Sequence, residues 1–205
     1  MSTDTEMTLP AGNTSPDLST GSVWFIGNAT VLIRYAGFTI LTNPTFIHMH
    51  EQVPLEYGLH TKRLTNPAIE IHELPLLDLI VLLHFHGDHF DQVAEQELDK
   101  SLPIVTTPEA TKELGQRGFN NTYPLDTWSS LTVGKGDIRF LITSTPGRHG
   151  SPLSEVVLPE VMGSIWEFQS PSGSILFSHL RREAPHHIIN WCGMNRLALI
   201  NSLML

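Results

Sequence analysis

Four residues of metal-ligating type follow an apolar run in the segment VLLHFHGDHFD, residues 81–91. They are His84, His86, Asp88 and His89. Imidazole nitrogens and carboxylate oxygens are ligands that zinc and other first-row metals accept, and a catalytic zinc keeps one position open for water. Polar side chains at the end of a buried strand cost free energy unless something binds them. The cluster therefore predicts a metal centre, and a polar loop that merely contains histidines is the alternative.

The spacing within this cluster allows its members to share one cavity. Side chains at alternate positions point the same way where a strand ends, so His84 and His86 can bind one ion while Phe85 turns toward the core. Gly87 lets the backbone bend tightly, which brings the next two ligands round to the same side. The spacing suits two adjacent metal positions.

Strand-like runs precede the cluster. VWFIG, TVLIRYA and FTILTN, within residues 23–43, predict antiparallel strands with a tight turn at Ala36-Gly37. DLIVLL, residues 78–83, is a continuous apolar run that predicts a strand covered on both faces, and the histidines begin at its C-terminal end. Residues 44–77 contain four prolines and no sustained period. We expect this long excursion to lie near a pocket.

Helices and strands alternate after the cluster. A short helix is predicted around residues 91–99, followed by a strand in PIVTT and a helix from Pro108 to about Arg117, with Thr107 as its cap. The runs SSLTV and IRFLITST, joined by the turn GKGD, predict further strands. GSIWEFQSPSGSILFS predicts a hairpin that turns at residues 171–173. The pattern indicates an α/β fold.

Length, charge and composition limit the protein class. A chain of 205 residues with a net charge of −9 predicts one domain and argues against a nucleic-acid partner. Cys192 is the single cysteine, which favours a reducing cytoplasm. Residues 1–21 are predicted to form a flexible polar tail, and the sequence offers no apolar run of membrane-spanning length. Met49, Trp24 and Trp166 are assigned to core packing.

The arrangement H-x-H-x-D-H after a buried strand is the hallmark of the metallo-β-lactamase superfamily, which this chain resembles. The stretch VWFIGNATVLIRYAGFTILTNPTF resembles the opening of its branch of metal-dependent hydrolases similar to ascorbate-6-phosphate lactonase. The resemblance covers roughly residues 22–177 and implies a metallo-β-lactamase-like αβ/βα sandwich. The family's third histidine, on a loop after a later strand, corresponds to His149 in STPGRHG.

The resemblance also implies roles. The first metal would be held by His84, His86 and His149, and the second by Asp88 with His89. Zinc is the expected metal, as one or two ions, with manganese or iron as alternatives. The implied activity is hydrolysis of a small-molecule ester, lactone or phosphodiester by a metal-activated water. Asp88 is the expected catalytic residue, which orients that water and helps to move its proton.

Two departures from the family pattern bear on these expectations. Asn43-Pro44 stands where the family usually has Asp-Pro beside the metal site, so the shape is kept and the charge is lost. Ser178-His179 stands where the family has Gly-Asp-Thr, whose aspartate bridges both metals, and no aspartate occurs after Asp137.

The last residues resemble no part of the family. We therefore expect a domain over residues 22–177 that is incomplete in its C-terminal half, followed by a non-family tail over residues 178–205 from a changed reading frame, a retained intron or a mis-drawn gene end. An incomplete sandwich exposes a sheet, which predicts self-association. A catalytically silent form that binds metal or a partner is the alternative to an active hydrolase.

Other histidines are weaker candidates. His48 and His50 form a second H-x-H pair in the long excursion, where surface exposure is weighed against substrate contact. The remaining ones are assigned to the surface (His60, His72) or given a disfavoured ligand role because adjacent residues of a strand point apart (His186, His187).

Overall fold

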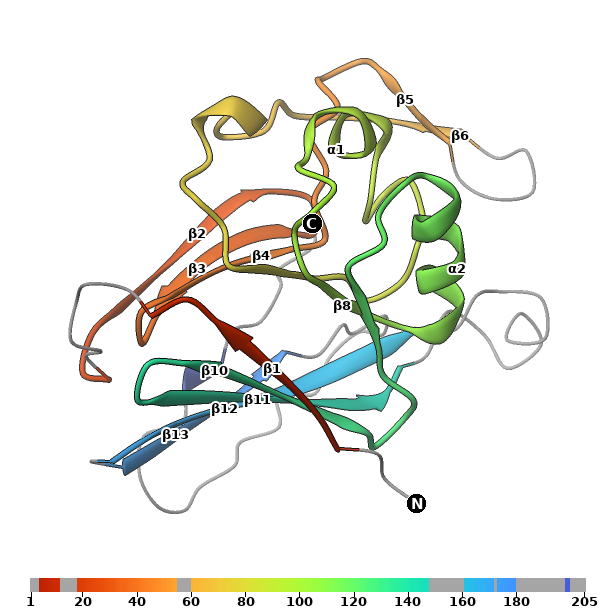
Figure 1. The fold of residues 1–205 in the computed structure, drawn as a ribbon. Coiled ribbons are helices and arrows are strands. Elements are labelled where there is room, and N and C mark those ends of the chain that lie inside the picture. Colours follow the sequence, from red (N-terminus) through yellow and green to blue (C-terminus); the bar gives the residue numbers. More distant parts are fainter. Residues whose placement is uncertain are drawn as a thin grey trace.

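Two β-sheets face each other and form a sandwich, with the helices beside one of the sheets (Figure 1). The computed structural model describes residues 4–11, 18–54, 60–147, 161–171, 173–179 and 198–199. The fold is an α/β sandwich, as the sequence predicts. None of the helices in these ranges is long and apolar enough to cross a membrane.

The sheet that leads to the metal-ligating cluster has the strand order β2-β3-β4-β7-β8-β9. The antiparallel strands β2, β3 and β4 come first, and the later strands join in parallel. Ala36 and Gly37 turn β3 into β4 with φ of 51° and 81°, the left-handed values that a tight hairpin turn needs. The strands are β2 (Gly21–Gly27), β3 (Thr30–Tyr35), β4 (Phe38–Thr42), β7 (Leu79–Val81), β8 (Ile104–Thr106) and β9 (Thr122–Pro124).

The facing sheet has the order β1-β10-β11-β12-β13-β14. Antiparallel pairing joins β10 to β11, β11 to β12 and β12 to β13, which confirms the predicted strands and the hairpin that turns near residue 171. The strands are β1 (Asp4–Leu9), β10 (Ser130–Lys135), β11 (Ile138–Pro146), β12 (Met162–Ser170), β13 (Gly173–His179) and β14 (Ala198–Leu199).

Strand β1 corrects the expectation of a flexible tail over residues 1–21. Asp4–Leu9 pairs in parallel with β10, and Met7 is buried in the core between the sheets. The alternation of polar and apolar residues in DTEMTL suits a sheet edge, but its partner strand lies far along the chain. Residues 12–17 lie outside the described residues.

Short elements form within the long segment over residues 44–77, and two short helices lie beside one sheet. The two-stranded pair β5–β6 and the 3-10 helix η1 interrupt the predicted irregular region over residues 44–77. Thr107 caps α2 by accepting a hydrogen bond from the Ala110 amide at 3.2 Å, and Pro108 occupies the first turn, as predicted. The elements are β5 (Gln52–Pro54), β6 (His60–Lys62), η1 (Ile71–Glu73), α1 (Gln92–Glu97) and α2 (Pro108–Gln116).

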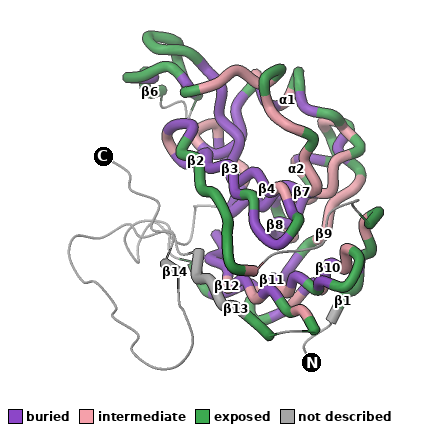
Figure 2. The backbone as a smooth tube through the Cα atoms, turned by 90° about the vertical axis from the view of Figure 1, so that its left-hand side faces the viewer, coloured by how far each residue is buried: buried purple, intermediate pink, exposed green. Residues whose placement is uncertain are grey.

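Two apolar clusters occupy the two sides of the β2–β9 sheet, and buried residues concentrate there in Figure 2. Between the sheets, aromatic rings such as Phe38, Phe140 and Phe168 pack together, and Trp166 is 1% exposed. On the other side, Leu82 and Phe46 pack against the helices.

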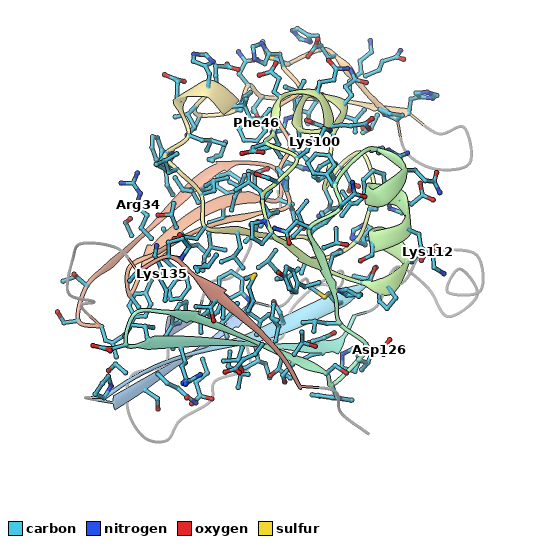
Figure 3. All side chains as sticks on the ribbon, viewed as in Figure 1. Arg34, Phe46, Lys100, Lys112, Asp126 and Lys135 are labelled. Carbon is cyan, nitrogen blue, oxygen red and sulfur yellow. The ribbon has the colours of Figure 1, made fainter. Side chains whose placement is uncertain are left out.

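At one edge the sheets are tied together by Lys135, labelled in Figure 3. Its ammonium group donates to the Gly37 carbonyl oxygen and to the Asp78 carboxylate, each at 2.7 Å. The Asp78 carboxylate also accepts from the Thr39 amide at 2.7 Å. This ion pair fixes the beginning of β7 and therefore the strand that delivers the metal-ligating cluster.

Candidate metal centre

The cluster begins where β7 ends. All three residues of β7 are buried, and Leu82 and Leu83 continue into the interior with 0% and 2% exposure. The strand is covered on both faces, by the core between the sheets and by the helix-side core, as the apolar run predicts. The residues that follow therefore enter the protein interior and do not return directly to solvent.

Three histidines and an aspartate converge at this point. His84, His86 and His89 are buried, at 0%, 7% and 1% exposure, whereas the side chain of Asp88 keeps 27%. One nitrogen or oxygen from each of His84, Asp88 and His89 lies within 4.8 Å of the others. His84 Nε2 also lies 3.1 Å from His86 Nδ1. The structure thus places the four predicted residues side by side.

The His84 ring lies close to one residue predicted to hold the first metal and to one predicted to hold the second. Its ring centroid is 4.7 Å from that of His86 and 4.2 Å from that of His89. The His89 Nε2 atom lies 3.5 Å from Asp88 Oδ2. The division of these residues between a first and a second metal stays a prediction.

Phe85 takes the orientation that the sequence predicts, whereas Gly87 is required by a close approach that the sequence did not indicate. Phe85 turns away from the cluster and packs on the helix side, 5.5 Å from the ring centroid of Phe90, with the Arg117 guanidinium over its face at 4.5 Å. A Cβ atom on Gly87 would lie 2.3 Å from the Pro54 carbonyl oxygen. Glycine is therefore required because β5 approaches the turn closely.

Asp91 fixes the far end of the cluster. One oxygen of its carboxylate accepts hydrogen bonds from the amides of Val93 and Ala94, which caps α1, and the other accepts from those of Phe46 and Ile47. Burial raises the pKa of the Asp91 carboxyl above its ordinary value, and the four backbone donors act in the opposite direction. The side chain joins the metal-ligating segment to the segment that follows β4.

Two asparagines contact the backbone of the cluster. The Asn43 side-chain oxygen accepts from the Leu83 amide at 3.0 Å, and its amide nitrogen donates to the Ala29 carbonyl at 3.5 Å. The Asn28 side-chain nitrogen donates to the Asp88 carbonyl at 2.5 Å. Asn43 is 1% exposed, and its side chain both accepts and donates, so an amide suits this position and a carboxylate would not.

The second H-x-H pair lies at the surface. His48 and His50 are exposed, and the His48 Nε2 atom pairs with the carboxylate of Glu70 at 3.0 Å. This hydrogen bond and the Glu70 charge raise the pKa of the His48 imidazole above its ordinary value, with a smaller contribution from Glu51. His60 is exposed too, as predicted.

Some of the remaining predicted residues are described by the structure and others are not. His72 is exposed, as predicted. Trp24, which the sequence assigns to the core, is 49% exposed, because β2 is the edge strand of its sheet. Met49 is 42% exposed, which also corrects its assignment to the core. Three histidines lie outside the described residues, namely His149, His186 and His187.

The buried donor set fits a divalent metal ion. Imidazole nitrogens and a carboxylate oxygen are borderline ligands that zinc, manganese and iron accept. His84 and His89 are almost fully excluded from water, and each offers a nitrogen within 4.8 Å of a carboxylate oxygen of Asp88. A metal held among His84, Asp88 and His89 would be bound by two buried imidazoles and one carboxylate.

Sequence reasoning did not identify Asp91 and Asn28 as parts of the centre. Asp91 carried a signal, because an aspartate directly before a helical stretch is a favoured N-cap. Asn28 carried none, because it lies in the β2–β3 turn, far from Asp88 in the sequence.

Comparison with known proteins agrees with this geometry. A family described as the Beta-lactamase superfamily domain matches residues 39–201, which is well over half of the chain. A Saccharomyces cerevisiae protein named N-acyl-phosphatidylethanolamine-hydrolyzing phospholipase D, mitochondrial, is 30% identical over 144 residues, which are 69% of this chain and 29% of the yeast protein. The UPF0173 protein YddR of Bacillus subtilis is 28% identical over 159 residues, 74% of this chain and 59% of YddR. The chain thus spans less than two thirds of the length of either relative.

Solved structures share the fold. An isothiocyanate hydrolase from Delia radicum gut bacteria has a TM-score of 0.60 at 23% identity, covering 79% of this chain and 64% of the other. A structure described as a possible metal-dependent hydrolase from Veillonella parvula also has a TM-score of 0.60, at 22% identity, with 77% and 61% covered. At these identities the likeness concerns the fold alone. With the family match and the H-x-H-x-D-H cluster at the end of β7, the chain belongs to the beta-lactamase superfamily.

Proposed function

We propose that this chain is a metal-dependent hydrolase that acts on an ester, lactone or phosphodiester of a small molecule. The observation that carries the proposal is the convergence of His84, Asp88 and His89, whose ligand atoms lie within 4.8 Å at the buried end of β7. The name of the yeast relative, a phospholipase D, is consistent with phosphodiester cleavage. Zinc, as one or two ions, suits the donors, and manganese or iron are alternatives.

We assign different roles to the residues of the centre according to their solvent exposure. A bound divalent metal supplies Lewis-acid polarisation of the substrate and lowers the pKa of water. His84 and His89 are buried, so their rings are held in place by packing. Asp88 keeps 27% of its side chain exposed, so it is the more accessible of the three residues whose ligand atoms converge. We assign to Asp88 the orientation of the attacking water and the transfer of its proton.

Metal content and turnover test the proposal together. The protein would be purified without added metal, analysed for zinc, manganese and iron, and assayed with a lactone, an aryl ester and an aryl phosphodiester. Stoichiometric metal with chelator-sensitive turnover of at least one substrate is the expected result. A protein that takes up no divalent metal after stripping would contradict it.

A catalytically silent metal-binding form is the second candidate. It rests on Ser178-His179, which stands where the resemblance places the Gly-Asp-Thr aspartate that bridges two metals. Two closely spaced cations need shared anionic ligands to offset their repulsion. Tight binding of one zinc without turnover of any substrate class would favour this candidate over the hydrolase.

Self-association through an exposed sheet edge is a further expectation. Strand β2 lies at the end of its sheet, has no charged residue, and exposes about half of Val23, Trp24 and Phe25 (53%, 49% and 51%). Two copies can pair such strands without like-charge repulsion. Sedimentation velocity would test it, with Trp24→Ser expected to reduce association.

A cytoplasmic location is proposed on the single cysteine alone.

A further inference from the structure

The Asp88–His89 peptide bond links two of the three residues whose ligand atoms converge, and both of its polar groups are engaged. The Asp88 carbonyl accepts from the Asn28 side-chain amide at 2.5 Å, and the His89 amide donates to the His86 carbonyl at 2.9 Å. A peptide held at its carbonyl and its amide cannot rotate freely. Its orientation sets where the side chains of Asp88 and His89 begin.

Asn28 lies in a turn that is itself fixed. Its φ is 54°, a left-handed conformation that asparagine adopts more readily than most residues. The register of β2 against β3 shifts between Phe25 and Gly27, directly before it. The turn follows this irregularity and carries the Asn28 side chain toward the metal-ligating segment.

Buried hydrogen bonds tie the other side of this turn to the end of β4. The Ala29 carbonyl accepts from the Thr42 hydroxyl at 3.2 Å. The Thr30 hydroxyl donates to the Asn43 carbonyl at 2.7 Å and accepts from the Thr45 amide at 2.9 Å. The Asn28 amide therefore extends from a rigid support, so its hydrogen bond can restrain the segment that it reaches.

We propose that Asn28 is a positioning residue of the metal centre, which holds the Asp88–His89 peptide so that both side chains reach the same ion. The inference rests on the proposed metal-dependent function. Residues that orient metal ligands typically contribute about 10- to 100-fold to metal affinity. Asn28 acts through the Asp88 backbone and is assigned no contact with substrate.

Asn28→Gly is the decisive variant, because glycine adopts the left-handed conformation without strain and lacks the side-chain donor. Zinc affinity of the stripped protein would be measured by competition with a fluorescent chelator. We expect affinity to fall by about 10- to 100-fold, while the thermal midpoint of the metal-free protein changes by less than about 4 °C. Unchanged zinc affinity would overturn the proposal.

Two controls separate positioning from general effects of the substitution. Asn120→Gly removes another side-chain amide that donates to a backbone carbonyl, that of Gly118 at 3.4 Å, at an exposed position. Ala36→Gly places glycine in another left-handed turn, with φ of 51° in the wild-type chain. Both should keep wild-type zinc affinity. A loss in either control equal to that in Asn28→Gly would overturn a specific role for Asn28.

Hydrogen exchange at the His89 amide gives a readout that needs no metal. That N–H belongs to the same peptide as the Asp88 carbonyl, so loss of the Asn28 donor should speed its exchange by about tenfold or more in the metal-free protein. Unaltered exchange would contradict the proposal. If the wild-type protein binds no zinc, the proposed function fails, and exchange at His89 still decides whether Asn28 restrains the peptide.

Discussion

The chain carries two H-x-H pairs, and the structure places them in opposite environments. His84 and His86 follow a strand that is covered on both faces, and they are 0% and 7% exposed. His48 and His50 lie at the surface, where the His48 side chain keeps 51% of its area and pairs with Glu70. The same residue types at the same spacing thus form part of a candidate metal centre in one place and a solvated ion pair in the other.

The preceding chain explains the difference. The apolar run of β7 carries the backbone into the interior, whereas the chain after β4 returns to the surface beyond Ile47. Asp91 connects the two segments, because its carboxylate holds the amides of Phe46 and Ile47 as well as the start of α1. The two pairs therefore share a structural support and differ in burial, which makes them matched subjects for mutation.

The largest expected effect separates the two pairs directly. His84→Ala combined with His86→Ala removes buried nitrogen donors, so zinc affinity of the stripped protein should fall by more than about 100-fold, beyond the loss typical of groups that merely orient ligands. His48→Ala combined with His50→Ala should retain the affinity. Isothermal titration of both double variants makes the comparison. An equal loss in the surface pair would show that both pairs contribute to metal binding.

Asp91→Asn tests the shared support. An asparagine keeps the shape of the side chain but puts an NH₂ group where an oxygen now accepts two backbone donors. Because hydrogen bonds to a charged acceptor contribute about 1.5–3 kcal/mol, the free energy of unfolding should fall by about 2–3 kcal/mol. Urea denaturation measures it.

Asp99→Asn is the matched control for Asp91. Asp99 also accepts hydrogen bonds from a backbone amide and a hydroxyl, both of Ser101, but it is exposed. Its substitution should leave the urea midpoint almost unchanged, because surface substitutions rarely alter stability much. Similar losses in both variants would argue against a special role of the buried carboxylate.

The sequence predicts the parts of this comparison that depend on local pattern. The apolar run before His84 predicts a buried strand, and the turn at Ala36-Gly37 predicts the hairpin that precedes it; the structure confirms both. Long-range pairings leave no such signal. Strand β1 within the predicted tail pairs with β10 far along the chain, and the contact from Asn28 to Asp88 joins two loops whose proximity only the folded sheet creates.

Asn43→Asp tests whether the position beside Leu83, directly before the buried H-x-H pair, favours an amide or a carboxylate. The family resemblance places an aspartate here, but the Asn43 amide donates to the Ala29 carbonyl while its oxygen accepts from the Leu83 amide. A carboxylate would direct an oxygen at a carbonyl oxygen, so the free energy of unfolding should fall by about 1–2 kcal/mol. Asn121→Asp, whose amide donates to the Ser101 carbonyl at an exposed contact, is the control. A stabilised Asn43→Asp protein would show that the site favours the charge.

The smallest effect concerns the surface pair and its dependence on pH. The hydrogen bond to Glu70 and the Glu70 charge raise the folded-state pKa of His48 above the unfolded value near 6.5. The resulting stabilisation is fully present below the unfolded pKa and is lost as the pH rises through the folded pKa.

Because both side chains are largely exposed, at 51% and 40%, the ion pair should contribute less than about 0.5 kcal/mol, and 1 M salt should reduce it. Thermal midpoints of the wild type and His48→Gln, measured from pH 5 to 9, should therefore differ slightly at pH 5 and converge by pH 9. His72→Gln, at another exposed histidine, controls for loss of an imidazole. A difference between wild type and His48→Gln that grows with pH would contradict the assigned ion pair, and with it the reading of the second H-x-H pair as a surface feature.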